Sequence, residues 1–371
     1  MLRLLHTADW QLGLKAGQLG ARAAELVREA RLEVVERLAE LAHARQLDAV
    51  LVAGDVFDDN AVGATVVRQA VHLLERFAPI PVYLLPGNHD ALTPDTVYDR
   101  AEFTPGPHVH VLREAAPVPL AGGRGVLYPC PLRERWPGAD PTAWIPPRAA
   151  AEAACWRVGL AHGAVDRLPE SEQAPARIAQ DRAARAGLDY LALGDWHGTC
   201  RVDERTWYAG TPEQTRMKEQ GAGHALVVEL EVPGQPPHVE QIRVARLGWY
   251  AVEAELYGAE DVAALERRLA AEVTQPRRAL LELVLAGELA PQAHRALAEL
   301  VRRWGELVLH LRVRGEARLR TSAAELDALA PAGLARAAAE RLHLQAERGE
   351  GAEAERARRA LALLLELAGE G

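Results

Sequence analysis

The chain has 371 residues, which is too long for one average domain and predicts two or three. Hydrophobic residues make up 49% of it and charged residues 26%, which is ordinary for a protein that buries a sizeable core. The net charge of −9 excludes a chain coated in basic charge, although a local groove or a bound metal ion can still attract phosphate groups.

Apolar strands and amphipathic helices alternate along the first part of the chain. Apolar residues recur at helical spacing in two segments, which predicts helices at 24–44 and 64–77. Continuous apolar runs before, between and after them predict strands at 2–7, 48–53 and 81–85. This order of elements is typical of a parallel α/β layout.

The strands that follow extend the same domain. They are predicted at 109–112, 125–129, 157–161 and 190–193. Three more strands, expected to be antiparallel, would complete the domain at 206–209, 225–231 and 239–244.

The pattern changes near residue 248, which divides the chain into three predicted regions. The first domain covers 1–246. Residues 247–320 contain a strand–helix–strand–helix–strand unit, which predicts a small second domain. Residues 321–371 are rich in Ala, Leu, Glu and Arg and are expected to be helical.

Cysteine usage and hydropathy indicate a cytoplasmic protein without a membrane partner. The three cysteines, Cys130, Cys155 and Cys200, lack the spacing of a zinc site and are expected to be reduced thiols. The sequence shows no basic and apolar leader and no run of about 18 apolar residues.

Five predicted strands end in polar side chains that can bind metal. Because the carboxyl ends of parallel strands gather at one edge of a sheet, we expect these side chains to lie together. Carboxylates, imidazoles and an amide oxygen suit divalent ions such as manganese, zinc or iron. Two ions about 3.5–4 Å apart would clamp the oxygens of a phosphoryl displacement, while a free histidine protonates the leaving oxygen. The residues are Asp9 with Gln11, Asp55, Asn88 with His89, His162, and Asp195 with His197.

Each of these residues also has an ordinary structural interpretation. The Asn88-His89-Asp90 segment could be a hydrogen-bonded turn, and Asp55 could cap the following helix. His162 could be a core histidine whose hydrogen bonds are satisfied. His6 lies inside a predicted strand and is expected to be structural rather than a ligand.

The motifs at these strand ends resemble those of the calcineurin-like metallophosphoesterases, and within them the SbcD-type DNA repair nucleases. The resemblance covers about residues 1–220 and implies a four-layer α/β/β/α sandwich, followed by a small α/β capping domain and a helical C-terminus. The matching segments are His6–Gly13, Gly54–Asp58, Gly87–Asp90, Ala161–Gly163, Gly194–His197 and Tyr208–Glu213.

The resemblance also implies a role for each residue. Two divalent ions are expected, with Mn²⁺ as the first choice and Mg²⁺, Zn²⁺ or Fe²⁺ as alternatives. His89 corresponds to the catalytic histidine, and Asp58 takes the position of its partner. The ligands of the first ion would be Asp9, Gln11, Asp55 and His197, and those of the second Asp55, Asn88, His162 and Asp195, with Asp55 shared.

Two positions depart from the family pattern, which has histidine at both. Gln11 offers a neutral amide oxygen, so the first ion should bind less tightly or through water. Asp195 adds a negative charge and should shift the second position toward manganese or magnesium. A centre that has lost activity through these changes is the alternative.

The resulting hypothesis is a metal-dependent DNA nuclease of DNA repair. Its capping domain would help to position DNA, and it would work with an SMC-like, long-coiled-coil ATPase that docks on the C-terminal helices at about 322–371. A homodimer formed through helices of the catalytic domain is also expected. The alternatives are a phosphodiesterase for small nucleotides and a catalytically weakened DNA-binding or regulatory subunit.

Overall fold

The computed structural model describes residues 1–17, 19–166, 176–217, 219–320 and 333–348, together with 353–354, 356–357, 360–361 and 364. The chain divides into two compact units, Met1–Leu247 and Gly248–Gly371. Strands and helices occur in both units, so the predicted α/β class is confirmed. Most of the region predicted as helical at 321–371 lies outside the described residues, which include helix α7 (Leu334–Arg348).

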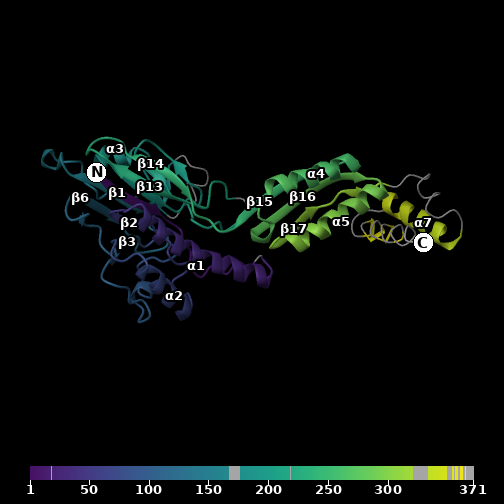
Figure 1. The fold of residues 1–371 in the computed structure, drawn as a ribbon, viewed down its shortest axis with the longest axis horizontal. Helices are drawn as coiled ribbons and strands as arrows, with labels where there is room; N and C mark the ends of the chain where they lie inside the picture. Colours follow the sequence, from purple (N-terminus) through teal and green to yellow (C-terminus); the bar gives the residue numbers. More distant parts are fainter. Residues whose placement is uncertain are drawn as a thin grey trace. The chain divides into compact units, whose positions relative to one another are not determined.

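A six-stranded sheet forms the centre of the first unit (Figure 1). Strands β1 to β4 run parallel to one another, and β13 pairs with β1 in the antiparallel direction. The strand order is β14-β13-β1-β2-β3-β4, so β1 lies inside the sheet. The strands are β1 (Leu2–Thr7), β2 (Ala49–Val52), β3 (Val82–Leu84), β4 (Val109–Val111), β13 (His224–Leu230) and β14 (His238–Arg243).

Helices α1 (Ala21–Ala44) and α2 (Ala64–Glu75) cover one face of this sheet (Figure 1). Their apolar side chains recur every three or four residues, which places Val27, Val34 and Leu38 of α1 on one buried stripe. Leu5 of β1 packs in the same core, whereas Leu4 points to the opposite face. Alternation along the strand thus separates two cores.

A second six-stranded sheet packs against that opposite face. Its order is β11-β12-β10-β7-β6-β5, and the core between the sheets joins Leu4 of the first sheet to Val158 and Ala192 of the second. The strands are β5 (Val118–Leu120), β6 (Gly125–Cys130), β7 (Trp156–His162), β10 (Tyr190–Gly194), β11 (Cys200–Arg201) and β12 (Thr206–Tyr208).

The direction of the strand predicted at 206–209 differs from the expectation. Strand β12 runs parallel to β10 and antiparallel to the short β11. The two-residue strand β11 reverses the chain once more than the sequence pattern indicates, so β12 returns in the direction of β10. The other two strands of that set, β13 and β14, are antiparallel as predicted.

The outer face of the second sheet carries another core, which includes the short helix α3 (Arg182–Ala186). Gly187 ends this helix in the left-handed conformation, with φ of 60°. A two-stranded parallel pair, β8 (Ala164–Val165) and β9 (Arg177–Ile178), lies directly after β7 in the chain and before α3.

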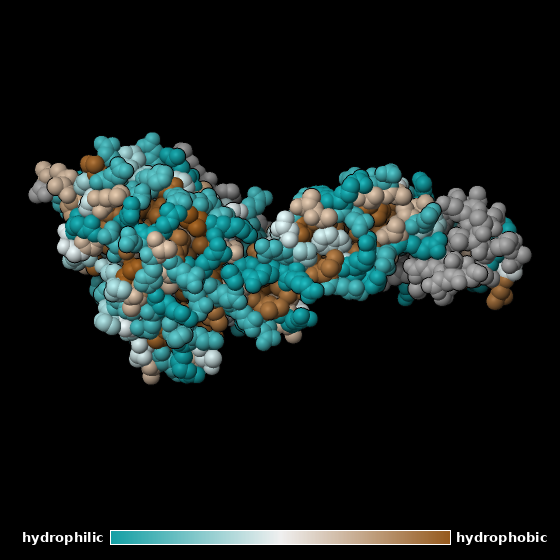
Figure 2. Space-filling view, in the orientation of Figure 1, coloured by the Kyte–Doolittle hydropathy of each residue, from teal (hydrophilic) through white to brown (hydrophobic). Residues whose placement is uncertain are grey.

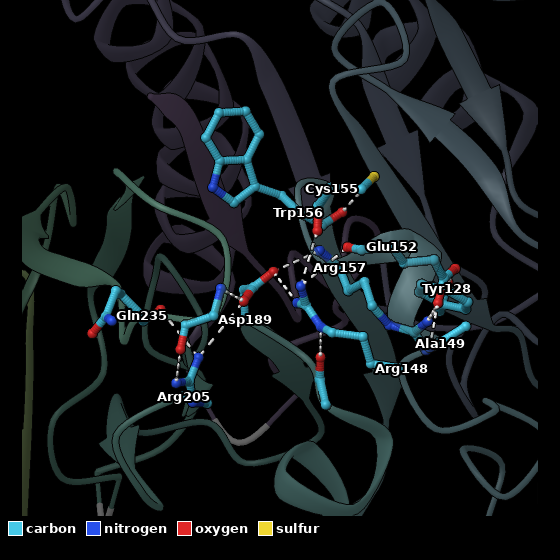
Figure 3. A network of polar contacts seen from close by, with 12 residues as sticks. Tyr128, Arg148, Ala149, Glu152, Cys155, Trp156, Arg157, Asp189, Arg205 and Gln235 are labelled. Carbon is cyan, nitrogen blue, oxygen red and sulfur yellow. Dashed lines mark hydrogen bonds and ion pairs between the residues drawn. The ribbon is translucent and has the colours of Figure 1, made fainter.

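A network around Asp189 holds together the N-terminal ends of β7 and β10 (Figure 3). The fully buried carboxylate of Asp189 accepts hydrogen bonds from the Arg157 backbone N–H at 2.8 Å and from Arg148 at 2.5 Å. Its other oxygen accepts the Gly234 N–H at 2.6 Å and lies 3.7 Å from Arg205. The strands that carry His162 and Asp195 at their far ends are thereby fixed side by side.

The second unit repeats the β-α-β pattern predicted for it. Strands β15, β16 and β17 are parallel neighbours, and the apolar faces of helices α4 and α5 complete one core with them. Strand β18 (Arg318–Leu319) adds a short parallel pairing with β16. The other elements are β15 (Gly248–Leu256), α4 (Ala259–Glu272), β16 (Ala279–Leu289), α5 (Pro291–Leu307) and β17 (His310–Gly315).

Hydrophilic residues cover most of the surface seen in Figure 2, and hydrophobic residues occur there in separate patches. Among the residues that the structure describes, no helix is long and apolar enough to cross a membrane.

Replacing Asp189 by Ala should lower the free energy of unfolding of the first unit by about 3–5 kcal/mol, because two arginines, the buried N–H of Arg157 and the N–H of Gly234 lose their acceptor. Chemical denaturation followed by circular dichroism measures this loss. The matched control is Asp181→Ala, which removes an exposed i,i+4 pair with Arg185 and should cost less than about 0.5 kcal/mol. Equal losses in the two variants would contradict this account of the network.

Candidate metal centre

Side chains from both sheets meet where their strands end. Asp9 follows β1, Asp55 follows β2 and Asn88 follows β3, all in the first sheet. His162 ends β7, and Asp195 follows β10 in the second sheet. Two hydrogen bonds link the loops of the first sheet, since Asp9 N–H donates to Gly54 O and Gln11 N–H to Asp55 O. The predicted convergence of strand ends thus draws on two sheets rather than one.

Four of the predicted site residues adopt a left-handed backbone that non-glycine residues rarely take. The φ angles are 52° at Asp9, 44° at Gln11, 52° at Asp55 and 100° at Asp195. Each such residue costs on the order of 1–3 kcal/mol, and such residues cluster at functional sites. The sharp turns redirect the chain immediately after each strand.

His162 is held in one orientation by the end of β2. Its Nδ1 lies 2.8 Å from the carbonyl oxygen of Ala53, which can only accept, so Nδ1 carries a proton and donates it. Nε2 then faces three oxygen atoms, at 2.8 Å from Asn88 Oδ1, 3.6 Å from Asp55 Oδ2 and 3.8 Å from Asp195 Oδ1. A histidine fixed this way at Nδ1 presents Nε2 to a metal.

These residues fit a divalent cation. Asp9, Asp55 and His162 each offer a ligand atom, and the three atoms lie within 4.8 Å of one another. The spacings around His162 Nε2 are near the roughly 3–3.5 Å that separates neighbouring ligands of an ion with bonds of about 2.1 Å. Several buried acceptors face one another here, and a cation can satisfy them all.

The glycines of two motifs make this approach of the sheets sterically feasible. A Cβ at Gly54 would lie 2.1 Å from Nδ1 of His162, and one at Gly194 would lie 1.9 Å from the carbonyl oxygen of Ala53. Any side chain at either position would push His162 away from β2. The Gly54-Asp55 and Gly194-Asp195 pairs therefore combine a glycine that allows close packing with a predicted ligand.

Burial and like charges shift the pKa values of the centre. Burial raises the pKa of Asp9 to about 7, with Asp55 and Asp195 adding to the shift and His162 and His197 opposing it. Burial also raises the pKa of Asp195. For His162 burial lowers the pKa, but the carboxylates of Asp55, Asp9 and Asp195 together raise it to about 9. Without a metal ion the centre therefore retains protons.

His197 is oriented by a residue that the sequence did not single out. Its Nδ1 lies 2.6 Å from Glu219 Oε1, and Nε2 lies 3.1 Å from the amide nitrogen of Gln11. Glu219 is itself held by the Thr215 N–H at 2.7 Å. Burial raises the pKa of Glu219, but its hydrogen bond and charge interaction with His197 and its bonds to Thr215 lower the pKa to about 2.

Asp90 organises the loop after β3. Its buried carboxylate accepts the Gly87 N–H at 2.7 Å, the Phe57 N–H at 3.1 Å and the Tyr98 hydroxyl at 2.6 Å. Burial, with Asp55, raises its pKa to about 6 against the effect of these hydrogen bonds. Asp90 therefore supports the loop, and Tyr98 is a partner that no motif indicated.

His89 is held by two contacts to the neighbouring loop. Its backbone N–H donates to Asp55 Oδ1 at 2.9 Å, and its Nδ1 donates to the main-chain carbonyl oxygen of Asp58 at 2.7 Å. The partnership expected between His89 and Asp58 is thus made through the backbone of Asp58. Within the described part of the chain, the hydrogen bonds of His89 use its backbone N–H and Nδ1 and not Nε2.

The segment Tyr208–Glu213 supports the loops from outside. The Thr211 hydroxyl donates to the carbonyl oxygen of Asp9 at 2.8 Å, and the Tyr208 hydroxyl donates to that of Gly163 at 2.7 Å. Arg31 of α1, which is buried, donates to the carbonyl oxygens of Trp10 and Glu213. These hydrogen bonds give the segment Tyr208–Glu213 a structural role, although it contains no expected metal ligand.

His6 is structural, as its position in the strand predicted. Its ring nitrogens contact the Tyr190 hydroxyl at 2.8 Å and the Leu193 carbonyl oxygen at 3.1 Å, across the two sheets. Burial lowers the pKa of His6 to about 3, so the ring is neutral.

Comparison with known proteins identifies a family and several relatives of this chain. A family model described as calcineurin-like phosphoesterase matches residues 2–199, which include every predicted ligand from Asp9 to His197. The chain is 28% identical over 280 residues to the DNA double-strand break repair protein Mre11 of Aeropyrum pernix, covering 69% of this chain and 64% of the relative. The protein of the same name from Methanosarcina acetivorans is 23% identical over 242 residues, or 63% and 37% of the two chains. A subunit of the nuclease SbcCD from Bacillus subtilis is 29% identical over 114 residues, or 30% and 27%. The matches span less than two thirds of the length of each relative.

Metal binding should release protons and should tighten as the pH rises from 6 to 9. Asp9 keeps its proton up to pH about 7 and His162 up to about 9, and each proton must leave when that residue binds a metal ion. At pH 8 we expect release of about one proton per ion, mainly from His162. Calorimetric titration with Mn²⁺ in two buffers of different ionisation enthalpy measures it. Affinity that is independent of pH would contradict these pKa shifts.

Replacing Asp90 by Asn should weaken metal binding by about 10–100-fold, because an amide cannot accept all three hydrogen bonds that hold the loop of Asn88. The same titration measures this change. Asp95→Asn, an exposed change in the same loop region, should leave the affinity unaltered. A similar affinity for both variants would show that Asp90 does not position Asn88.

Proposed function

Because the chain belongs to the calcineurin-like phosphoesterase family, we propose that it is a metal-dependent DNA nuclease that hydrolyses phosphodiester bonds. Members of this family use divalent metal ions. The observation that carries the proposal is the cluster around His162, where an oriented imidazole nitrogen faces the oxygen atoms of Asn88, Asp55 and Asp195. DNA as the substrate is supported by relatives that are named as a DNA repair protein and a nuclease subunit.

The residues divide into ion-holding and proton-moving groups. We assign Asp55, Asn88, His162 and Asp195 to one ion, and Asp9, Gln11 and His197 with the shared Asp55 to the other. When bound, such ions supply Lewis acidity and a nucleophilic water at neutral pH. The carboxylates of Asp55 and Asp195 favour a harder ion, and we propose Mn²⁺.

His89 is proposed as the acid that protonates the leaving oxygen. Its Nδ1–H is taken by the Asp58 carbonyl oxygen, which accepts that hydrogen bond both before and after Nε2 has lost a proton. Nε2 is therefore the atom that delivers the proton. The backbone N–H of His89 on Asp55 fixes the distance between this acid and the ion-holding group.

The other parts of the chain are proposed to serve DNA access. The acidic average, with a net charge of −9, favours a partner that supplies much of the DNA affinity, and we propose an SMC-like coiled-coil ATPase. Its docking site would be the segment at about 322–371, most of which lies outside the described residues. The domain at 247–320 would help to position DNA, and catalytic domains would pair as a homodimer in the cytoplasm.

The decisive experiment compares substrates under several metal ions. End-labelled linear DNA and circular DNA, each single- and double-stranded, are incubated with Mn²⁺, Mg²⁺ or Zn²⁺ beside a cyclic nucleotide. We expect Mn²⁺-dependent cleavage of DNA that a chelator abolishes. Hydrolysis of the cyclic nucleotide alone would make the protein a small-molecule phosphodiesterase, and DNA binding without cleavage would indicate a regulatory subunit.

Replacing His89 by Ala should lower kcat for DNA cleavage by about 10²–10⁴-fold, because the leaving oxygen loses its acid. Metal affinity and DNA binding should remain those of the unmodified protein, since the ring of His89 is assigned no ligand role. His72→Ala, on the exposed face of α2, is the matched control and should cleave normally. Full cleavage by the His89 variant would remove this residue from the mechanism.

A further inference from the structure

Both ring nitrogens of His197 already have partners within the protein. Glu219 takes Nδ1 at 2.6 Å, and the amide of Gln11 lies 3.1 Å from Nε2, the atom that a metal would need. An amide carries a donor and an acceptor, so it can satisfy Nε2 whether or not that nitrogen holds a proton. Gln11 is only 4% exposed, which keeps its side chain among these groups rather than in solvent.

Nε2 of His162 also has a partner within the protein, the amide oxygen of Asn88 at 2.8 Å, so the two histidines differ in which atoms face this nitrogen. Nδ1 of His162 is fixed by Ala53, but Nε2 faces oxygen atoms, two of which belong to the carboxylates of Asp55 and Asp195. A cation placed there gains two negative charges and an amide oxygen. The two metal positions are therefore unequal, with one prepared for an ion and the other closed by a side chain.

We propose that the Gln11 side chain reversibly blocks the first metal position through its contact with His197, and we call this side chain a plug. The centre holds one resident divalent ion, bound by Asp55, Asn88, His162 and Asp195, and takes a second ion at Asp9 and His197 only when the Gln11 amide turns away. This inference rests on the metal-dependent hydrolysis proposed above.

The charges at the first position indicate what removes the plug. Among the residues assigned to this ion, Asp9 supplies one unshared carboxylate, because Asp55 also serves the resident ion. The anionic oxygens of a phosphodiester would add the missing charge and could coordinate the second ion directly. Entry of the second ion would then be coupled to substrate binding, and the complete two-ion centre would form on bound DNA.

Counting bound ions separates a plug from a weak ligand. Native mass spectrometry and calorimetry with Mn²⁺ should give one tightly bound ion in the unmodified protein and two in Gln11→His. Removing the amide in Gln11→Ala should tighten the second ion several-fold, because the competing hydrogen bond is gone, whereas loss of a ligand would weaken it. A weaker second ion in Gln11→Ala therefore overturns the proposal.

Electron paramagnetic resonance gives a second readout that does not depend on activity. One Mn²⁺ ion produces an isolated six-line signal, and two ions that share Asp55 produce an exchange-coupled spectrum. The unmodified protein should change from the first to the second on addition of a dinucleotide with a phosphorothioate linkage. Gln11→His should show the coupled spectrum in the absence of the dinucleotide. A coupled spectrum of the unmodified protein in the absence of the dinucleotide would overturn the proposal.

The outcomes also distinguish this proposal from the proposed function. Two ions of equal affinity in the unmodified protein would contradict the proposed role of Gln11 but not the proposed nuclease function. No bound ion in either the unmodified protein or Gln11→His would contradict both proposals. Gln241→His, an exposed change on β14, is the matched control and should bind as the unmodified protein does.

Discussion

The hydrogen bond from His162 Nδ1 to the carbonyl oxygen of Ala53 joins the C-terminal edges of the two sheets. It exists because Gly54 and Gly194 bring no side chain into the space between β2 and β7. The same bond decides which ring nitrogen faces the carboxylates. The packing of the two sheets and the orientation of His162 therefore depend on the same contact. The network of Asp189 at the far ends of β7 and β10 keeps these strands in the register that the contact requires.

Much of this arrangement could be predicted from the sequence because its signals are local. Apolar runs mark the strands, helical spacing marks α1 and α2, and the polar residues after each strand mark the edge where they converge. The groups that orient the site residues could not be predicted in the same way. The carbonyl oxygens of Ala53 and Asp58 leave no trace in the side-chain pattern, and Glu219 and Tyr98 lie in segments whose proximity depends on the tertiary fold. The division of five strand ends between two sheets likewise depends on long-range pairing.

The structure shows which groups surround Gln11 and Asp195, the two residues that depart from the family pattern. The sequence predicts Gln11 as a weak ligand through its oxygen, while the structure brings its amide nitrogen against His197. Asp195 adds a third carboxylate to Asp9 and Asp55, and it contributes to the raised pKa of Asp9, whose main cause is burial. In the proposed two-ion centre, loss of an imidazole at position 11 and gain of a negative charge at position 195 would both favour binding of the ion at Asp195 over the ion at Gln11.

The position of β13 has a consequence for how the protein is made. This strand fills the place beside β1, so the first sheet lacks one neighbour of its own interior strand until residues near 230 have been synthesised. The proposed metal ligands are spread from Asp9 to His197 and pass through the ribosome in that order. If the proposed centre holds metal, a nascent chain carries the early carboxylates long before the centre is complete, and metal acquisition is a late step of the nearly finished first unit.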